Sequence, residues 1–159
     1  MKKIKIAVIG LGYVGLPLAV EFAKKYKVVA FDVNSKRVKE LIKGTDHTLE
    51  ITDENLKNVL VENAKALANK KIGLLPSCDI KDISLATIYI VTVPTPIDKH
   101  KKPDVSYLIS ESKMIANVLK KDDIVSYEST VYTSYTEEDG VPVLEQYSRL
   151  KFNKDNFCS

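Results

Sequence analysis

Short runs of β-branched and apolar residues alternate along the chain with longer segments in which apolar residues recur every three or four positions. The first pattern predicts strands and the second predicts helices. The predicted strands cover residues 3–9, 27–33, 71–75, 85–93 and 123–127. The predicted helices cover residues 13–25, 34–43, 53–69, 103–119 and 135–147, and residues 151–159 receive no assignment. This alternation predicts an α/β fold of the Rossmann type, doubly wound, with a mainly parallel sheet and helices on both faces.

The composition limits the size and the class of the protein. A chain of 159 residues forms one domain of common size, and is too short for a cofactor domain together with a complete substrate domain. Hydrophobic residues make up 45% and charged residues 28%, as in ordinary globular domains. The net charge of +3 is too small to favour binding to nucleic acid or to an anionic membrane. The longest uncharged stretch, residues 6–20, is too short to span a bilayer.

The cysteines and histidines are few and scattered. Cys78 and Cys158 lie far apart, and neither a signal peptide nor an Arg-rich presequence precedes the first predicted strand. We therefore expect reduced thiols in a cytoplasmic protein. The two histidines, His47 and His100, form no pair with a cysteine at metal-ligand spacing, so the sequence predicts no metal site.

Half of the six glycines fall in one window between the first predicted strand and the first predicted helix. The window has the pattern G-x-G-x-x-G, which in this context is typical of a dinucleotide-binding turn. The first glycine permits a tight turn, the second lets a pyrophosphate approach the backbone, and the third lets the helix pack closely on the strand. In a dinucleotide-binding turn, N–H groups at the start of the helix would face the phosphates. The alternative interpretation is a glycine-rich turn between strand and helix that binds no ligand. The window consists of Gly10, Leu11, Gly12, Tyr13, Val14 and Gly15.

An acidic residue follows at the end of the second predicted strand. Asp32 stands twenty residues after Gly12, where a carboxylate accepts hydrogen bonds from the adenosine ribose and repels a 2′-phosphate. The cofactor is therefore predicted to be NAD, in preference to NADP. Lys36 and Arg37 complicate this prediction, because a cation could pair with a 2′-phosphate, although Arg37 could instead lie along the adenine face. The structural alternative for Asp32 is that it caps the next helix.

Two further loops follow predicted strands. Val93, Pro94 and Thr95 follow the fourth strand, and Ser129 and Thr130 follow the fifth. Ligands of open α/β sheets bind at the carboxyl ends of the strands, so these residues are candidates for the same cofactor site. The alternative is that the two threonines are ordinary turn residues.

Five segments in order carry a resemblance to a known family. Together they resemble the amino-terminal domain of the UDP-glucose/GDP-mannose dehydrogenases, and most closely the UDP-N-acetylhexosamine 6-dehydrogenases of bacterial surface polysaccharide biosynthesis. The resemblance runs from residue 2 to about residue 157. The segments are Gly-Leu-Gly-Tyr-Val-Gly-Leu-Pro (10–17), Phe-Asp-Val-Asn (31–34), Val-Pro-Thr-Pro (93–96), Lys-Pro-Asp (102–104) and Glu-Ser-Thr-Val-Tyr (128–132).

The resemblance implies an activity and a set of residues. These enzymes oxidise the C6 alcohol of a nucleotide sugar to a carboxylate with two NAD⁺, through an aldehyde and a thioester on a cysteine. The family's NAD site is lined at the positions of Gly10 to Gly15, Asp32, Arg37, Val93 to Thr95, Ser129 and Thr130. The threonine at the position of Thr130 also helps to hold a water beside the reacting carbon, which makes Thr130 the one candidate catalytic residue.

The chain departs from the family at its end. Residues 1–159 would form the NAD-binding domain with an incomplete last strand, without the central helix, the UDP-sugar-binding domain, and the catalytic Glu, Lys, Asn and Cys. Cys158 is not that cysteine, and Arg149 stands where the family often has Gly. Whether this chain is itself an enzyme is therefore left open, and we expect no activity from it alone and UDP-sugar binding only in a full-length enzyme.

Two alternatives to a dehydrogenase portion are kept open. The chain could be a stand-alone module that binds or senses NAD(H), or a non-functional remnant. In the second case, the missing last strand would leave the fifth strand as an exposed sheet edge, which predicts self-association.

Overall fold

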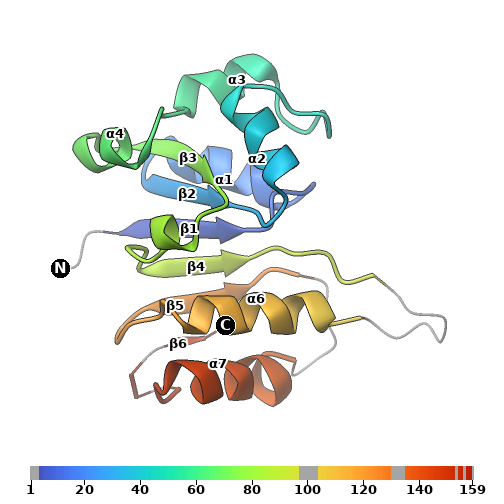
Figure 1. Ribbon diagram of the computed structural model, residues 1–159, viewed down its shortest axis with the longest axis vertical. Helices are drawn as coiled ribbons and strands as arrows, with labels where there is room; N and C mark the ends of the chain where they lie inside the picture. Colours follow the sequence, from blue (N-terminus) through green and yellow to red (C-terminus); the bar gives the residue numbers. More distant parts are fainter. Residues whose placement is uncertain (1–3, 97–103, 130–134, 153, 156, 159) are drawn as a thin grey trace.

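A six-stranded parallel sheet, in the order β3-β2-β1-β4-β5-β6, forms the centre of the computed structural model (Figure 1). The structure describes residues 4–96, 104–129, 135–152, 154–155 and 157–158. Each pair of neighbouring strands is parallel, as the predicted alternation of strands and helices requires. The strands are Lys5–Ile9 (β1), Lys27–Phe31 (β2), Gly73–Ser77 (β3), Ile88–Val91 (β4), Ile124–Tyr127 (β5) and Phe157–Cys158 (β6).

Helices cover both faces of this sheet, with α6 in front of it and α1 behind it in Figure 1. The predicted fold class, a doubly wound α/β fold of the Rossmann type, is confirmed. The helices are Gly15–Ala23 (α1), Ser35–Ile42 (α2), Asp53–Val59 (α3), Ala64–Asn69 (α4), Ile80–Ile83 (α5), Ser106–Ala116 (α6), the π-helical turn Thr136–Gly140 (η1) and Val141–Ser148 (α7).

The core is divided between the two faces because successive side chains of a strand point in opposite directions. In β1, Ile6 and Val8 pack with the buried face of α1, whereas Ala7 and Ile9 pack with the buried residues of α6 and α7. All four side chains are at most 3% exposed, which explains why β1 reads as a continuous apolar run. This buried strand holds the turn that follows it in a fixed position.

The helix predicted over residues 53–69 is wrong in one respect, because two helices occupy this stretch. Leu60 has an extended backbone, and the N–H of Val61 donates a hydrogen bond to the carbonyl of Leu74 on β3 at 2.9 Å. α4 then begins after Asn63, whose side chain accepts a hydrogen bond from the N–H of Ala66 at 2.9 Å. A hydrogen bond to the sheet therefore breaks a helix that the apolar spacing alone would continue.

The region around β4 also differs from the prediction. The strand predicted over residues 85–93 is shorter, Ile88–Val91, and the one-turn helix α5 before it was not predicted. Asp79 begins α5 by accepting a hydrogen bond from the N–H of Lys81 at 2.9 Å. A single turn is too short to show a helical period, so the sequence pattern contains no sign of it. The predicted helix over 103–119 is likewise shorter, and begins at Ser106.

The predicted exposure of β5 at the sheet edge is wrong. The strand β6, which the sequence left unassigned, pairs with β5 through Ile124 with Phe157 and Val125 with Cys158. Two residues are too few for a strand pattern to be recognised. β5 is therefore an inner strand over its first half, and the premise for self-association through its exposed edge is lost there.

Candidate functional site

A cavity of about 360 Å³ lies where the carboxyl ends of β1, β2 and β4 meet. Its walls come from the turn after β1, the end of β2, the loop after β4 and the helix α6. Both its volume and its place at the carboxyl ends of parallel strands are typical of ligand sites in open α/β sheets.

Each of the three glycines of the turn meets a different local demand. Gly10 has a φ of +93°, a conformation that L side chains rarely adopt. At Gly12 an added Cβ would meet no atom within 4 Å, so the space above this peptide is open. At Gly15 the same Cβ would lie 1.8 Å from the carbonyl oxygen of Gly10 and 2.4 Å from Oγ1 of Thr92. The turn therefore needs glycine at its ends for folding, and keeps open space at its middle glycine.

The start of α1 has no capping side chain, although the N–H of Leu16 donates a hydrogen bond to the carbonyl of Gly12 at 3.3 Å and Pro17 has no N–H. Val14 occupies the N-cap position and makes no side-chain hydrogen bond there. Tyr13 precedes it, lines the cavity, and is 70% exposed. Uncapped N–H groups at a helix start attract the oxygens of an anionic ligand, and the partial positive charge of the helix end adds to this attraction. Val14 and Gly15 do not line the cavity; they shape the turn.

Asp32 lies directly after β2 and faces the glycine turn. Its Oδ2 accepts a hydrogen bond from the N–H of Leu11, and its Oδ1 accepts one from the N–H of Asn34, each at 2.8 Å. These two bonds fix the carboxylate at the cavity wall, and each oxygen can accept further bonds from a ligand hydroxyl. The capping alternative for Asp32 is wrong, because the side chain of Asn34 caps α2.

Arg37 is buried beneath the same turn, with 5% of its surface exposed. Its Nε donates a hydrogen bond to the carbonyl of Leu11 at 2.9 Å. Its Nη2 pairs with Asp46 at 2.8 Å and its Nη1 pairs with Glu40 at 3.1 Å. A guanidinium engaged by two carboxylates has less to offer a 2′-phosphate, and the other candidate cation, Lys36, is exposed and does not line the cavity.

Asp46 is a residue of this region that sequence reasoning missed. It is 4% exposed and accepts hydrogen bonds from the hydroxyl of Thr48 at 2.7 Å and from the N–H of Ile51 at 3.1 Å. Burial raises its pKa, but the hydrogen bonds from Thr48, Arg37 and the backbone outweigh burial and lower the pKa to about 2. In the sequence it is one acidic residue in a polar loop, and only the fold shows that it anchors Arg37.

Thr92 was also missed, although it ties the glycine turn to β4. Its hydroxyl oxygen lies 2.8 Å from the carbonyl oxygen of Gly10 and 3.0 Å from that of Ile9, and the side chain is buried. The hydroxyl can donate to these carbonyls, so it holds the turn against the neighbouring strand. A threonine at the end of a strand is common, and its sequence position gave no signal of this contact.

The loop residues predicted after β4 and β5 are placed differently from one another. Val93 and Pro94 line the cavity, whereas Thr95 does not. The hydroxyl of Ser129 donates a hydrogen bond to the carbonyl of Val93 at 2.7 Å, so the start of the β5 loop is joined to the β4 loop. Thr130, the candidate catalytic residue, lies outside the described residues.

Glu111 on α6 is the third residue that the sequence did not indicate. It lines the cavity and is 8% exposed. Its Oε2 is buried and has no hydrogen-bond partner among the described residues. Burial, and then the nearby charge of Asp32, raise the pKa of this carboxyl to about 7. In the sequence this Glu stands in the polar run Ser-Glu-Ser-Lys (110–113), where it looks like an ordinary solvated residue.

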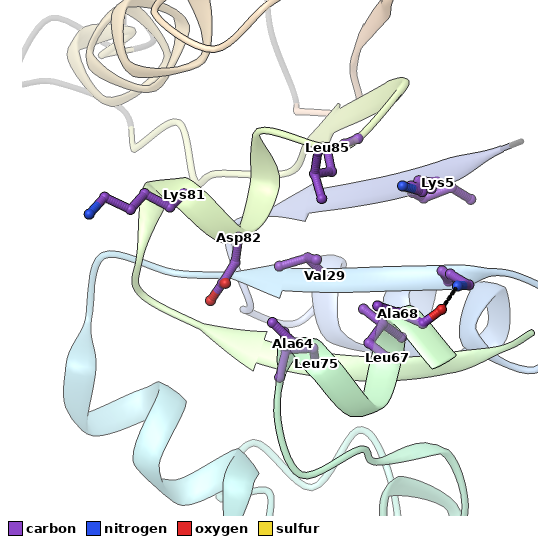
Figure 2. A pocket seen from close by; sticks show the side chains of 12 residues that line it. Lys5, Val29, Ala64, Leu67, Ala68, Leu75, Lys81, Asp82 and Leu85 are labelled. Carbon is purple, nitrogen blue, oxygen red and sulfur yellow. Dashed lines mark hydrogen bonds between the residues drawn. The ribbon is translucent and has the colours of Figure 1, made fainter. Parts of the chain in front are cut away.

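A second cavity, of about 160 Å³, lies on the sheet between α4 and α5 (Figure 2). Figure 2 shows apolar side chains such as Val29, Leu67 and Leu75 facing it, with Lys5 and Lys81 at its margins. It shares no residue with the cavity at the glycine turn and contains no turn of phosphate-binding type. The glycine turn therefore marks the candidate site.

Among the described residues there is neither a metal-binding cluster nor a membrane-spanning helix. No three His, Cys, Asp or Glu side chains there are grouped so that they could hold a metal ion. None of the described helices is both long and apolar enough to cross a membrane.

Comparisons with known proteins agree with this geometry. The chain is 52% identical over 158 residues to a UDP-N-acetyl-D-glucosamine 6-dehydrogenase of Pseudomonas aeruginosa, which covers 99% of this chain and 35% of that protein. It is 47% identical to protein CapL of Staphylococcus aureus, over 96% of this chain and 33% of that protein. The solved structure of a UDP-D-ManNAc dehydrogenase from Pyrococcus horikoshii superposes with a TM-score of 0.84 and 32% identity, over 98% of this chain and 35% of that one.

The chain thus spans about a third of the length of these relatives. The family described as "UDP-glucose/GDP-mannose dehydrogenase family, NAD binding domain" matches residues 4–157, which include all the helices and strands given above except Cys158, the last residue of β6. The chain therefore belongs to the UDP-glucose/GDP-mannose dehydrogenase family, as its NAD-binding domain.

Proposed function

We propose that the cavity at the glycine turn is where this chain holds NAD(H), and that the chain supplies the cofactor-binding part of a nucleotide-sugar 6-dehydrogenase. The observation that carries the proposal is the open space above Gly12 beside a carboxylate, Asp32, that backbone N–H groups hold in place. A pyrophosphate over Gly12 would lie at the N-terminal end of α1, whose partial positive charge attracts it. The adenosine ribose would then lie within reach of Asp32.

The nicotinamide end of the cofactor would extend toward the loops after β4 and β5. Val93 and Pro94 line the cavity on that side, and Ser129 is tied to Val93, which supports a role for both loops in positioning this end. Thr95 and Thr130 are proposed for the same region on the family resemblance alone. For Thr130 the proposed task is to hold a water beside the carbon that reacts.

The substrate is proposed from the relatives. The relative from Pseudomonas aeruginosa is named a UDP-N-acetyl-D-glucosamine 6-dehydrogenase, and we propose that a full-length enzyme containing this domain oxidises a UDP-sugar of this kind for surface polysaccharide. NAD⁺ supplies the hydride-accepting chemistry when it is bound. We propose that the 159-residue chain alone binds NAD(H), does not turn over the sugar, and acts in the cytoplasm.

Isothermal titration of the purified chain with NAD⁺ and with NADP⁺ tests the proposal. We expect saturable binding of NAD⁺, and NADP⁺ binding weaker by about tenfold or more, because a 2′-phosphate would lie against the Asp32 carboxylate. Incubation with UDP-N-acetylglucosamine and NAD⁺ should produce no NADH absorbance. A folded chain that binds neither dinucleotide would refute the cofactor assignment, and NADH production would refute the claim of inactivity.

A further inference from the structure

The helix α6 forms one wall of the cavity. The phosphates and the ribose of a bound dinucleotide would contact the glycine turn and Asp32, so neither group accounts for this wall. In the proposed arrangement the pyrophosphate lies over Gly12 and the ribose lies at Asp32, so the adenine base must lie beyond Asp32 along the cavity. Glu111 lines the same cavity, and Asp32 is the charged group that acts on its carboxyl. Glu111 is therefore next to the position where the base joins the ribose.

We propose that Glu111 binds the adenine base, by hydrogen bonds between its carboxyl group and the N1 and N6 atoms of the ring. This inference rests on the proposed binding of NAD(H). It assigns to Glu111 the task of recognising the base, separate from the recognition of the ribose by Asp32.

The burial of Glu111 supports this role. The residue is 8% exposed, and Oε2 has no partner among the described residues. A buried carboxyl oxygen without a hydrogen bond destabilises a fold, so such groups are rare unless they meet a ligand or take part in chemistry. The other buried acidic group near this site, Asp46, is by contrast fully engaged by Arg37, Thr48 and backbone N–H groups. An adenine base would supply the missing partner for Glu111.

The protonation of Glu111 suits the polar edge of adenine. Burial and the Asp32 charge raise the pKa of Glu111 to about 7, so a neutral carboxyl is well populated near neutral pH. A neutral carboxyl presents one donor and one acceptor side by side. The adenine edge presents the complementary pair, an acceptor at N1 and a donor at the N6 amino group.

The surroundings of Glu111 suit a flat aromatic ring. Val33 and Tyr107 line the cavity and are 67% and 54% exposed, although both side chains are large and apolar in the main. A base seated among these side chains would cover apolar surface that water now contacts, which favours binding.

The test compares NAD⁺ with 1,N6-etheno-NAD⁺, in which a two-carbon bridge joins N1 to N6 and removes the polar edge. Both ligands are titrated into the wild-type chain, Glu111→Gln and Glu111→Leu, with Glu62→Gln as a control. Glu62 is exposed and does not line the cavity, so its variant removes a carboxylate without touching the site. Thermal melts verify that each variant is folded.

We expect the wild type and Glu62→Gln to bind NAD⁺ about tenfold or more tightly than the etheno analogue, as a two-point hydrogen bond to a base edge provides. Glu111→Gln, which keeps one donor and one acceptor, should retain most of this preference. Glu111→Leu should bind NAD⁺ about tenfold more weakly and show no preference.

Equal affinity of the wild type for the two ligands would overturn the proposal while leaving NAD binding intact. An unchanged preference in Glu111→Leu would also overturn it, because the bridge would then be rejected by its bulk alone. If Glu111→Leu does not fold, loss of the preference in Glu111→Gln would count against the paired hydrogen bonds. Failure of every folded protein to bind NAD⁺ would instead refute the proposed function.

Discussion

Adding a single methyl group at Gly12 or at Gly15 should separate binding from folding. In the unliganded chain a Cβ on Gly12 meets nothing within 4 Å, whereas a Cβ on Gly15 would lie 1.8 Å from a backbone oxygen. Gly12→Ala should therefore fold normally and bind NAD⁺ poorly. Gly15→Ala should lower the free energy of unfolding even in the absence of ligand.

The magnitudes follow from these contacts. At Gly12 the added methyl group costs nothing sterically, and the smaller freedom of the unfolded chain changes the free energy of unfolding by at most about +1 kcal/mol. At Gly15 the Cβ must move away from the carbonyl of Gly10 by more than about 1 Å to reach an ordinary contact distance. Such overpacking costs about 1–3 kcal/mol or more, and Ala recovers less than about 1 kcal/mol of it through its better helix propensity.

The assay pairs urea denaturation with NAD⁺ titration on the same preparations. We expect Gly12→Ala to keep the midpoint of the wild type and to bind NAD⁺ at least about tenfold more weakly, because its Cβ would stand where the pyrophosphate approaches. Gly15→Ala should unfold at clearly lower urea. Wild-type affinity in Gly12→Ala, or a wild-type midpoint in Gly15→Ala, would refute this reasoning.

Three other substitutions test single contacts. Asp32→Asn should weaken NAD⁺ binding about tenfold and reduce the preference over NADP⁺, measured by titration calorimetry, since the amide no longer repels a 2′-phosphate. Asp46→Asn should lower the free energy of unfolding by about 3 kcal/mol, because it leaves the buried Arg37 with one carboxylate fewer. The pKa of Asp46 is lowered from 3.8 to about 2 in the folded chain. This shift contributes about 2 kcal/mol to the free energy of unfolding above pH 4, and the contribution is lost as the pH falls toward 2. Urea midpoints of the wild type should show this loss, and those of Asp46→Asn should not. Arg149→Gly should raise the free energy of unfolding by up to about 1 kcal/mol in thermal melts, because Arg149 ends α7 with a φ of +63°; an unchanged or lower melting temperature would contradict this.

The parts of the fold that the sequence predicted are those governed by local pattern. β1, α1 and β2 are recognisable from the runs and spacings of apolar residues, and the glycine window lies between the first two. The folding roles expected of Gly10 and Gly15 agree with the positive φ of the first and the close backbone approach at the second, while at Gly12 the structure shows open space and the pyrophosphate contact stays a prediction. The outcome for residues 53–69 was different, because Val61 leaves the helical pattern to bond with β3. A contact with a distant strand cannot be read from the local spacing that predicted one helix.

The candidate site divides in the same way. Asp32 could be found by its distance from the glycine turn, because in this fold that spacing is set by one strand, one helix and two short connections. Thr92 and Glu111 could not, since each is defined by its neighbours across the sheet rather than along the chain. The sequence also could not predict that the Arg37 side chain is buried, because it is buried through its ion pair with Asp46, a residue of a separate loop.

The sequence alone thus determined the class of fold, the glycine turn and the carboxylate beside it, because each of these is encoded within a few residues or at a fixed spacing. The tertiary structure decided which polar groups are paired beneath the turn and which one, Glu111, faces the cavity unpaired among the described residues. Burial and hydrogen bonding depend on segments brought together from distant parts of the chain, and these terms set both the charge and the orientation of a side chain.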